Sequence, residues 1–122
     1  MKREQRLRTV ADFARVRDAA RRGWPHRLLV VYAAPNDLPY ARVGITVSGR
    51  VGKAVVRNKV RRRLREALRA RLARITAGLD VLVIARPASA SATWQELNQA
   101  LDALLERAGA TRPATETASA CV

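Results

Sequence analysis

Apolar positions along this chain recur with two different periods, and each change of period marks an element. Apolar residues spaced three and four apart indicate helices, and short runs rich in β-branched residues indicate strands. The predicted helices cover residues 10–21, 53–72 and 94–108, and the predicted strands cover residues 28–33, 41–47 and 79–85. The order α-β-β-α-β-α, with room for one further short strand, predicts a small α/β (α+β) protein built as a two-layer sandwich.

The connections between the predicted strands indicate how the strands pair. Residues 35–39 form a turn short enough for an antiparallel hairpin between the first two strands. The second strand, the long helix and the third strand form a β-α-β unit, which implies parallel pairing of those two strands. The third strand, Leu79–Ala85, is apolar nearly throughout, as expected of a central strand covered on both faces.

The length of 122 residues predicts a single domain, which we place at residues 1–109. Residues 1–8 are polar and basic, and we expect an arm that becomes ordered only on a partner. Residues 110–122 are rich in Ala and Thr without periodicity, which predicts a disordered tail. Ser91 or Thr93 is expected to cap the last helix, and Thr93 with Glu96 fits a capping box. Gly109 stands where the C′ residue of this helix should be.

Positive charge is concentrated in the N-terminal two thirds of the chain. Residues 1–74 hold 21 of the 24 Lys and Arg residues and 5 acidic residues, a net charge of +16, whereas residues 75–122 have a net charge of −2. Most of these cations are Arg, whose guanidinium group binds phosphate through two parallel hydrogen bonds. This distribution predicts a polyanionic partner, RNA or DNA.

The long predicted helix carries the densest part of this charge. Arg57, Arg61 and Arg65 stand four residues apart, and like charges at that spacing destabilise a helix by about 0.2–0.5 kcal/mol per pair. An external anion would relieve this repulsion, although a solvated charged face is the simpler alternative. Asn58 is a poor helix former that can donate and accept hydrogen bonds toward a sugar or base, unless it is an ordinary surface residue.

The sequence shows no recognisable catalytic cluster or membrane segment. His26 and Cys121 are the only residues of their types, and no carboxylate pair accompanies either, so no acid–base or metal site is predicted. Gly44 and Gly49 have the spacing of a nucleotide-binding loop, but Arg50 stands where that loop needs Lys followed by Ser or Thr. Without an 18-residue apolar run or cysteine pairs, the chain is expected to act in the cytoplasm.

The stretch Arg57–Arg62, preceded by Arg42–Ser48 and Val51–Val55, closely resembles the protein subunit of bacterial ribonuclease P. The resemblance extends to Asp12-Phe13 and to Leu79–Pro87, and covers roughly residues 5 to 109. The family's arginine-asparagine-arginine signature has Lys59 at its third position here. This change keeps the charge but loses the planar donor fork of Arg.

The resemblance implies an accessory subunit of a ribonucleoprotein endoribonuclease. Such a subunit binds the ribonuclease P RNA and the 5′ leader of precursor tRNA, and it aids the Mg²⁺-dependent removal of that leader. The RNA performs the catalysis and binds most of the Mg²⁺, so no protein catalytic residue and no tightly held protein metal are expected. Neither a membrane nor DNA is expected as a partner. The family also implies a left-handed β-α-β crossover, whereas the pattern alone predicts the common right-handed one.

The resemblance also implies which residues form the site. Those in the signature helix would bind RNA, and they are Lys53, Arg57, Asn58, Lys59, Arg61, Arg62 and Arg65. A leader cleft between the first helix and the sheet would hold Phe13, Arg17 and Tyr32. From composition alone, core packing is the alternative for the two aromatic residues. Family members often have an aromatic residue at position 17, but a guanidinium group can also stack on a base.

Three other functions remain as alternatives at this stage. A general RNA-binding, ribosome-associated or RNA-chaperone protein would bind RNA broadly without affecting tRNA 5′ processing. A membrane-surface protein would need exposed bulky apolar residues opposite the charges. A stand-alone nuclease would need the catalytic cluster that the sequence lacks.

Overall fold

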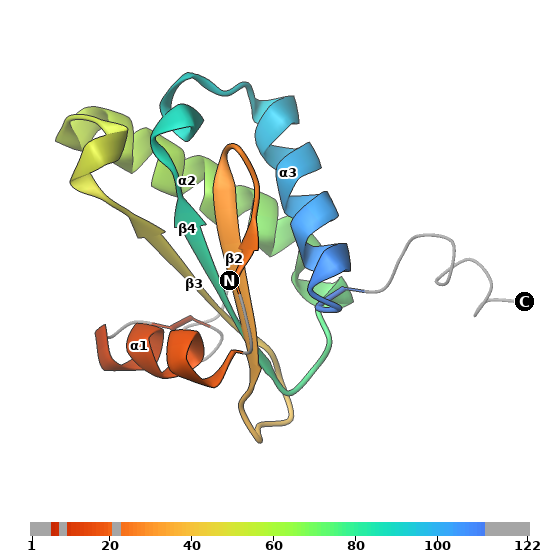
Figure 1. The fold of residues 1–122 in the computed structure, drawn as a ribbon. Coiled ribbons are helices and arrows are strands. Elements are labelled where there is room, and N and C mark those ends of the chain that lie inside the picture. The colour runs from red at the N-terminus through yellow and green to blue at the C-terminus, as the bar shows by residue number, and fades with distance from the viewer. Residues whose placement is uncertain (1–5, 8–9, 21–22, 112–122) are drawn as a thin grey trace, which may run out of the picture.

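The computed structural model describes residues 6–7, 10–20 and 23–111 (Figure 1). Its helices are α1 (Val10–Ala19), α2 (Ala54–Arg71) and α3 (Trp94–Arg107). Its strands are β1 (Trp24–Pro25), β2 (Leu29–Pro35), β3 (Arg42–Val47) and β4 (Leu79–Ala85). Short 3₁₀ helices η2 (Gly49–Val51), η3 (Leu72–Arg74) and η4 (Pro87–Ser91) lie between these elements. The mixed α+β fold class is confirmed, and β1 is the further short strand.

The four strands form one sheet in the order β1-β2-β4-β3. β4 pairs parallel with β3, as the β-α-β pattern predicted, and antiparallel with β2. The predicted hairpin between the strands at 28–33 and 41–47 is wrong, because β4 lies between them. β4 is apolar on both faces and takes the central position, where both faces are covered. The hairpin is instead made by β1 and β2, with Trp24 opposite Val31.

Alternate residues of the strands face two different helical layers. Val31 and Val83 belong to the main core, which α2 and α3 cover, whereas Ala34 and Leu82 belong to a smaller core beneath α1. The predicted two-layer sandwich is therefore wrong in this respect, since α1 lies on the opposite face of the sheet from α2 and α3. Val16 of α1 is fully buried in the smaller core, which gives the helix its attachment to that face.

The β3-α2-β4 connection is left-handed, as the family resemblance implied. In Figure 1 both strands run upward, β4 lies to the right of β3, and α2 passes behind the sheet between them. This handedness is rare, because the strand twist normally favours a right-handed crossover. In this arrangement α2 packs against the sheet next to β3.

Helices α2 and α3 cover the sheet with their apolar stripes. Leu64 and Leu68 of α2 and Leu101 and Leu104 of α3 are fully buried. The predicted capping box begins α3: the Glu96 amide donates to Thr93 Oγ1 at 3.1 Å, and the Thr93 amide donates to the Glu96 carboxylate at 2.9 Å. Gly109 ends this helix with a φ of 70°, as its predicted C′ position requires.

The structure describes only a few residues of the predicted arm and tail. Leu7 is buried and its amide donates to the Val43 carbonyl at 2.8 Å, so Arg6 and Leu7 run alongside β3. Residues 1–5 and 8 of the predicted arm lie outside the described residues. At the other end, Ala110 is fully buried, and Thr111 pairs with Ile75. Residues 112–122 again lie outside the description.

None of the helices in the described part of the chain combines the length and the apolar character needed to cross a bilayer.

Candidate RNA-binding surface

The cations of α2 fall into two groups according to whether the protein supplies them with a partner. Arg63 donates to the Ala92 carbonyl at 3.1 Å, and Arg69 pairs with Glu66 at 3.4 Å. The second group forms no ion pair with any carboxylate in the part of the chain that the structure describes. This group consists of Arg57, Lys59, Arg61, Arg62 and Arg65. The predicted site residues of α2 therefore carry charge that is available to an external anion.

Arg71 shows what a structural arginine looks like in the same helix. Its Nε and Nη2 donate to the two oxygens of Asp102 at 2.6 and 3.0 Å, and its Nη1 donates to the Ala67 carbonyl at 2.9 Å. The hydrogen bonds from Arg71 hold the pKa of Asp102 below its usual value. Arg71 is buried, with only 11 % of its side chain exposed, and it joins α2 to α3. It is thus committed to the fold.

A pocket of about 180 Å³ lies at the outer edge of β3, and we call it the β3-edge pocket. Its walls come from the N-terminal segment, from β3 and from α2, namely Arg6, Leu7, Val43, Gly44, Ile45, Arg61 and Arg65. Three guanidinium groups and no carboxylate line it. Because guanidinium groups make short, charge-assisted hydrogen bonds to phosphate, this pocket is suited to an anion.

The signature residues next to the pocket are partly organised before any ligand binds. Asn58 Oδ1 accepts a hydrogen bond from Arg61 Nη1 at 3.1 Å, which orients that guanidinium group. One helical turn earlier, Arg57 Nε is buried and has no hydrogen-bond partner within the described residues. A buried donor without a partner is unfavourable, so an external acceptor near Arg57 would stabilise the site.

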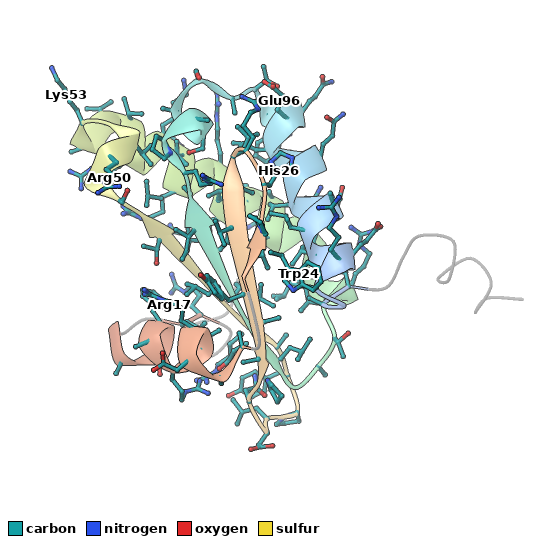
Figure 2. The ribbon with its side chains drawn as sticks, in the orientation of Figure 1. Arg17, Trp24, His26, Arg50, Lys53 and Glu96 are labelled. Carbon is teal, nitrogen blue, oxygen red and sulfur yellow. The ribbon has the colours of Figure 1, made fainter. Side chains whose placement is uncertain are left out.

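The remaining predicted helix residues lie outside the β3-edge pocket. Lys59 and Arg62 are exposed on α2, and Lys53 is the N-cap residue of that helix. Figure 2 shows Lys53 and Arg50 together at the end of the molecule that η2 forms. The structure therefore gathers Arg61 and Arg65 at the pocket and spreads the other cations along the exposed length of α2.

The face of the sheet under α1 is built from three rows of residues that lie opposite one another on β2, β4 and β3. From the covered end to the open end, the rows are Ala34-Asp80-Arg42, Tyr32-Leu82-Gly44 and Val30-Ile84-Thr46. Asp80 and Leu82 are fully buried, whereas every residue of the last row is only half-buried. We call this last row the open sheet face.

The predicted cleft residues border the open sheet face. Phe13 and Tyr32 are half-buried and pack against the small core beneath α1, so each has one packed part and one accessible part. Gly44 makes room for Phe13, because a Cβ on Gly44 would lie 2.8 Å from Phe13 Cε1. Gly44 also lines the β3-edge pocket and lies one row from Thr46 of the open sheet face, so the pocket and that face are neighbours. Arg17 is exposed and rises from α1 in Figure 2.

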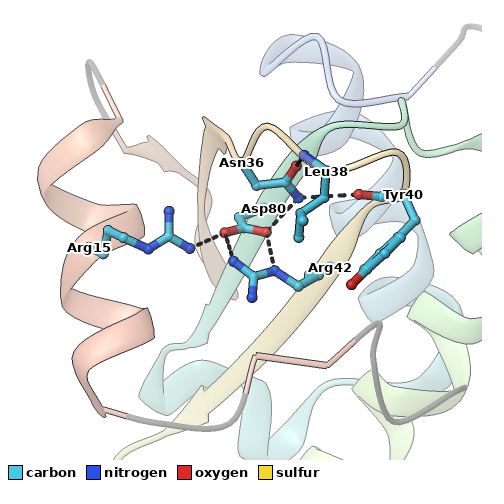
Figure 3. Close-up of polar contacts among 6 residues, drawn as sticks. All are labelled: Arg15, Asn36, Leu38, Tyr40, Arg42 and Asp80. Carbon is cyan, nitrogen blue, oxygen red and sulfur yellow. Dashed lines mark hydrogen bonds and ion pairs between the residues drawn. The ribbon is translucent and has the colours of Figure 1, made fainter.

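Asp80 is the fully buried carboxylate of the covered row, and the sequence analysis overlooked it within an apolar strand. It accepts hydrogen bonds from Arg42 Nε at 2.8 Å, Arg42 Nη2 at 2.7 Å and Asn36 Nδ2 at 2.8 Å. Arg15 reaches across from α1 to the same carboxylate (Figure 3). Burial opposes the charged form, but the hydrogen bonds from Arg42, Asn36 and Arg15 outweigh it and lower the pKa of Asp80.

Two further cations were missed by sequence reasoning. Arg6 was part of the predicted basic arm, but nothing in the sequence indicated that it would lie beside β3. Arg50 is exposed in η2, next to Gly49. Its positive charge was the only indication in the sequence that it could belong to this surface.

Nothing on this surface resembles a protein metal site. Across the described ranges, no three His, Cys, Asp or Glu side chains gather closely enough to hold a metal ion. Asp80, the buried carboxylate nearest the surface described above, is already paired with two guanidinium groups. The surface is thus organised around cations.

Comparison with known proteins identifies the family to which this chain belongs. The sequence profile of the family described as Ribonuclease P matches residues 1–109. The chain belongs to the ribonuclease P protein family. A ribonuclease P protein component from Herpetosiphon aurantiacus is 43% identical over 108 residues, covering 88% of this chain and 87% of that protein. The component from Pseudarthrobacter chlorophenolicus is 49% identical over 102 residues, covering 83% and 74%.

Solved structures of ribonuclease P proteins share the fold. The Staphylococcus aureus protein at 2.0 Å superposes with a TM-score of 0.81 at 31% identity, covering 88% of this chain and 98% of that one. The Thermotoga maritima protein superposes with a TM-score of 0.75 at 31% identity, covering 84% and 96%. The family resemblance inferred from the signature helix is therefore confirmed.

Proposed function

We propose that this chain is the protein subunit of a bacterial ribonuclease P and assists removal of the 5′ leader from precursor tRNA. The observation that carries the proposal is that two surfaces lie next to each other, on either side of Gly44, in a chain of this family. One is the cationic pocket between α2 and β3, and the other is the open sheet face bordered by Phe13 and Tyr32. An RNA strand offers both phosphates and bases, and this pair of surfaces is complementary to both.

Each part of the surface has a distinct task in this proposal. Arg61 and Arg65 hold backbone phosphates at the β3-edge pocket, and Arg57 gains the acceptor that it lacks in the free protein. Phe13 and Tyr32 stack on unpaired leader bases with their accessible parts. The exposed cations Lys53, Lys59 and Arg62 extend the positive surface along α2, where the ribonuclease P RNA can lie.

Catalysis in this proposal belongs to the RNA. Mg²⁺ supplies the hydrolytic chemistry when it is bound by the RNA components, and a surface of unpaired cations does not fit a protein-held divalent ion. The protein screens phosphate repulsion and positions the substrate, with no side chain acting as acid, base or nucleophile. Its partners are the ribonuclease P RNA and precursor tRNA in the bacterial cytoplasm, without DNA or a membrane.

A cleavage assay at low Mg²⁺ concentration tests this function. Precursor tRNA is incubated with the protein alone, with a bacterial ribonuclease P RNA alone, and with both. We expect 5′ leader cleavage only in the mixture, since phosphate repulsion is then screened by the protein. Cleavage by the protein alone would show that a protein active site exists. Tight RNA binding without rescue would instead favour the general RNA-binding or chaperone role.

A further inference from the structure

Helix α1 carries two of the three cleft residues but is weakly anchored by apolar contacts. It has 10 residues, and isolated helices of that length are marginally stable in water. Among its described side chains only Val16 is fully buried. A polar contact between α1 and the sheet can therefore have a large influence on where the helix lies.

Asp80 provides a rigid acceptor for such a contact. Three hydrogen bonds from Arg42 and Asn36 fix the carboxylate within the sheet. Asn36 is itself held by the loop that follows β2, because its Oδ1 accepts from the Leu38 amide at 2.8 Å and its Nδ2 donates to the Tyr40 carbonyl at 3.2 Å (Figure 3). Asp80 is thus fixed independently of α1, and Arg15 joins α1 to it.

We infer that Asp80, acting through Arg15, is a positioning residue that sets where α1 lies over the sheet. The ion pair thereby fixes the distance of Phe13 and Arg17 from the open sheet face. This inference rests on the proposed function, because it assigns the Arg15–Asp80 pair to the part of substrate affinity that depends on the leader. Neither residue touches the leader in this account.

The chain itself suggests a competing explanation. The Arg15 side chain is 44 % exposed, so Arg15 could bind an RNA phosphate directly. The two explanations differ in their response to salt. Loss of a direct phosphate contact lowers the slope of log affinity against log salt by about 0.7 to 0.9, whereas loss of a positioning contact weakens binding without changing the number of counterions released.

The experiment compares leader-bearing and leaderless precursor tRNA, each bound to the reconstituted holoenzyme. Arg15→Met removes the link to α1 but leaves Asp80 with its three hydrogen bonds from Arg42 and Asn36, so the sheet keeps its internal network. We define the leader gain as the ratio of the affinity for leader-bearing precursor tRNA to the affinity for leaderless tRNA. In Arg15→Met we expect the leader gain to fall about 5- to 10-fold, comparable to the loss of one stacked base. Affinity for leaderless substrate and for the ribonuclease P RNA should stay the same, with an unchanged salt slope.

Two companion variants separate positioning from charge. Arg15→Lys keeps a donor and the charge and should restore most of the leader gain. Arg27→Met is the matched control, because Arg27 is an exposed arginine paired with Glu96 on the far side of the molecule from Arg17 (Figure 2). It removes one cation as well and should leave the leader gain intact.

Asp80→Asn completes the test, because it keeps the Arg15 cation and removes its anchor. Positioning predicts the same loss as Arg15→Met and no further loss in the double variant. If Asp80→Asn does not fold, the Arg15 variants and their salt slopes still distinguish positioning of α1 from direct phosphate binding. A leader gain unchanged in Arg15→Met, or a reduced salt slope in that variant, would overturn this inference alone. A wild-type holoenzyme with no leader gain would overturn the proposed function as well.

Discussion

Arginine has two opposite tasks within the single helix α2, and the position of the nearest carboxylate determines which task each residue has. Arg71 meets both oxygens of Asp102 and a backbone carbonyl, and it is buried. Arg65 meets no carboxylate among the described residues and lines the β3-edge pocket. A paired guanidinium group stabilises the fold, and an unpaired one is free to bind RNA.

This contrast predicts opposite effects for two arginine substitutions. In Arg65→Ala, the slope of log affinity for precursor tRNA against log salt should fall by about 0.7 to 0.9, because one phosphate contact is lost. The free energy of unfolding should stay the same or rise. In Arg71→Met, the salt slope should stay the same and the free energy of unfolding should fall by about 1–2 kcal/mol, because buried hydrogen bonds to a charged group are lost.

Binding titrations at several KCl concentrations and urea unfolding of both variants provide these values. Equal changes in both quantities for Arg65→Ala and Arg71→Met would contradict the division of α2 into two groups.

At the scale of whole elements, local periodicity located the helices and strands well. The prediction for β4, residues 79–85, matches the structure, and α2 and α3 are displaced by a residue or so at their ends. Periodicity succeeds because it indicates which side of a single helix or strand is buried. Periodicity cannot report which elements are neighbours. For this reason the hairpin between β2 and β3 was predicted wrongly, and the side of the sheet that α1 covers was not predicted.

The candidate site was predictable only in part for the same reason. The sequence supplied the cations of α2, but it could not show that Arg71 would be paired and Arg65 unpaired. That distinction depends on α3, whose Asp102 is 31 residues away from Arg71. Asp80 was overlooked because one acidic residue in an apolar run gives no sign of the three partners that gather around it. The assignment of RNA-binding residues stays a prediction until binding is measured.

The close approach of α1 to β3 yields a prediction at Gly44. A Cβ added there would lie 2.8 Å from Phe13 Cε1 and 2.9 Å from Leu7 Cβ. Gly44→Ala should therefore displace Phe13 and lower the free energy of unfolding by about 1–3 kcal/mol, as overpacking does. The leader-dependent gain in holoenzyme affinity should fall too, while affinity for leaderless substrate should not.

Gly49→Ala is a suitable control for Gly44→Ala, because a Cβ added to Gly49 would meet nothing within 4 Å. Urea unfolding and paired binding assays measure both effects. An unperturbed leader gain in Gly44→Ala would mean that Phe13 does not need its present position.

For the molecule as a whole, Asp102 and Asp80 are among the carboxylates that link stability to pH. Hydrogen bonds from Arg71 lower the pKa of Asp102, and the donors around Asp80 outweigh its burial and lower the pKa of that group. A carboxylate whose pKa is lower in the folded state contributes stability above its unfolded value, about pH 3.9, and loses it as the pH falls through the folded value.

We therefore expect the free energy of unfolding to decline steeply below about pH 4. Asp102→Asn, which removes one of these groups, should be less stable near neutral pH and should show a shallower acid decline. Urea unfolding at constant ionic strength between pH 2.5 and 7 would measure it, with these limits chosen to lie roughly on both sides of the unfolded pKa. Parallel curves for the two proteins would exclude Asp102 as a source of the decline.

The strand order leaves β3 at one border of the sheet, where its outward backbone groups could accept a strand from another molecule. Leu7 occupies part of that border by donating to Val43, and Arg6 places a positive charge beside it. We therefore expect the N-terminal segment to hinder pairing of β3 with another molecule. Deletion of residues 1–7 should make the protein aggregate through β3 at a lower protein concentration than the full chain. Light scattering would measure this concentration, which should not depend on salt. The same stretch of backbone that borders the β3-edge pocket would then also keep β3 from pairing with a second molecule.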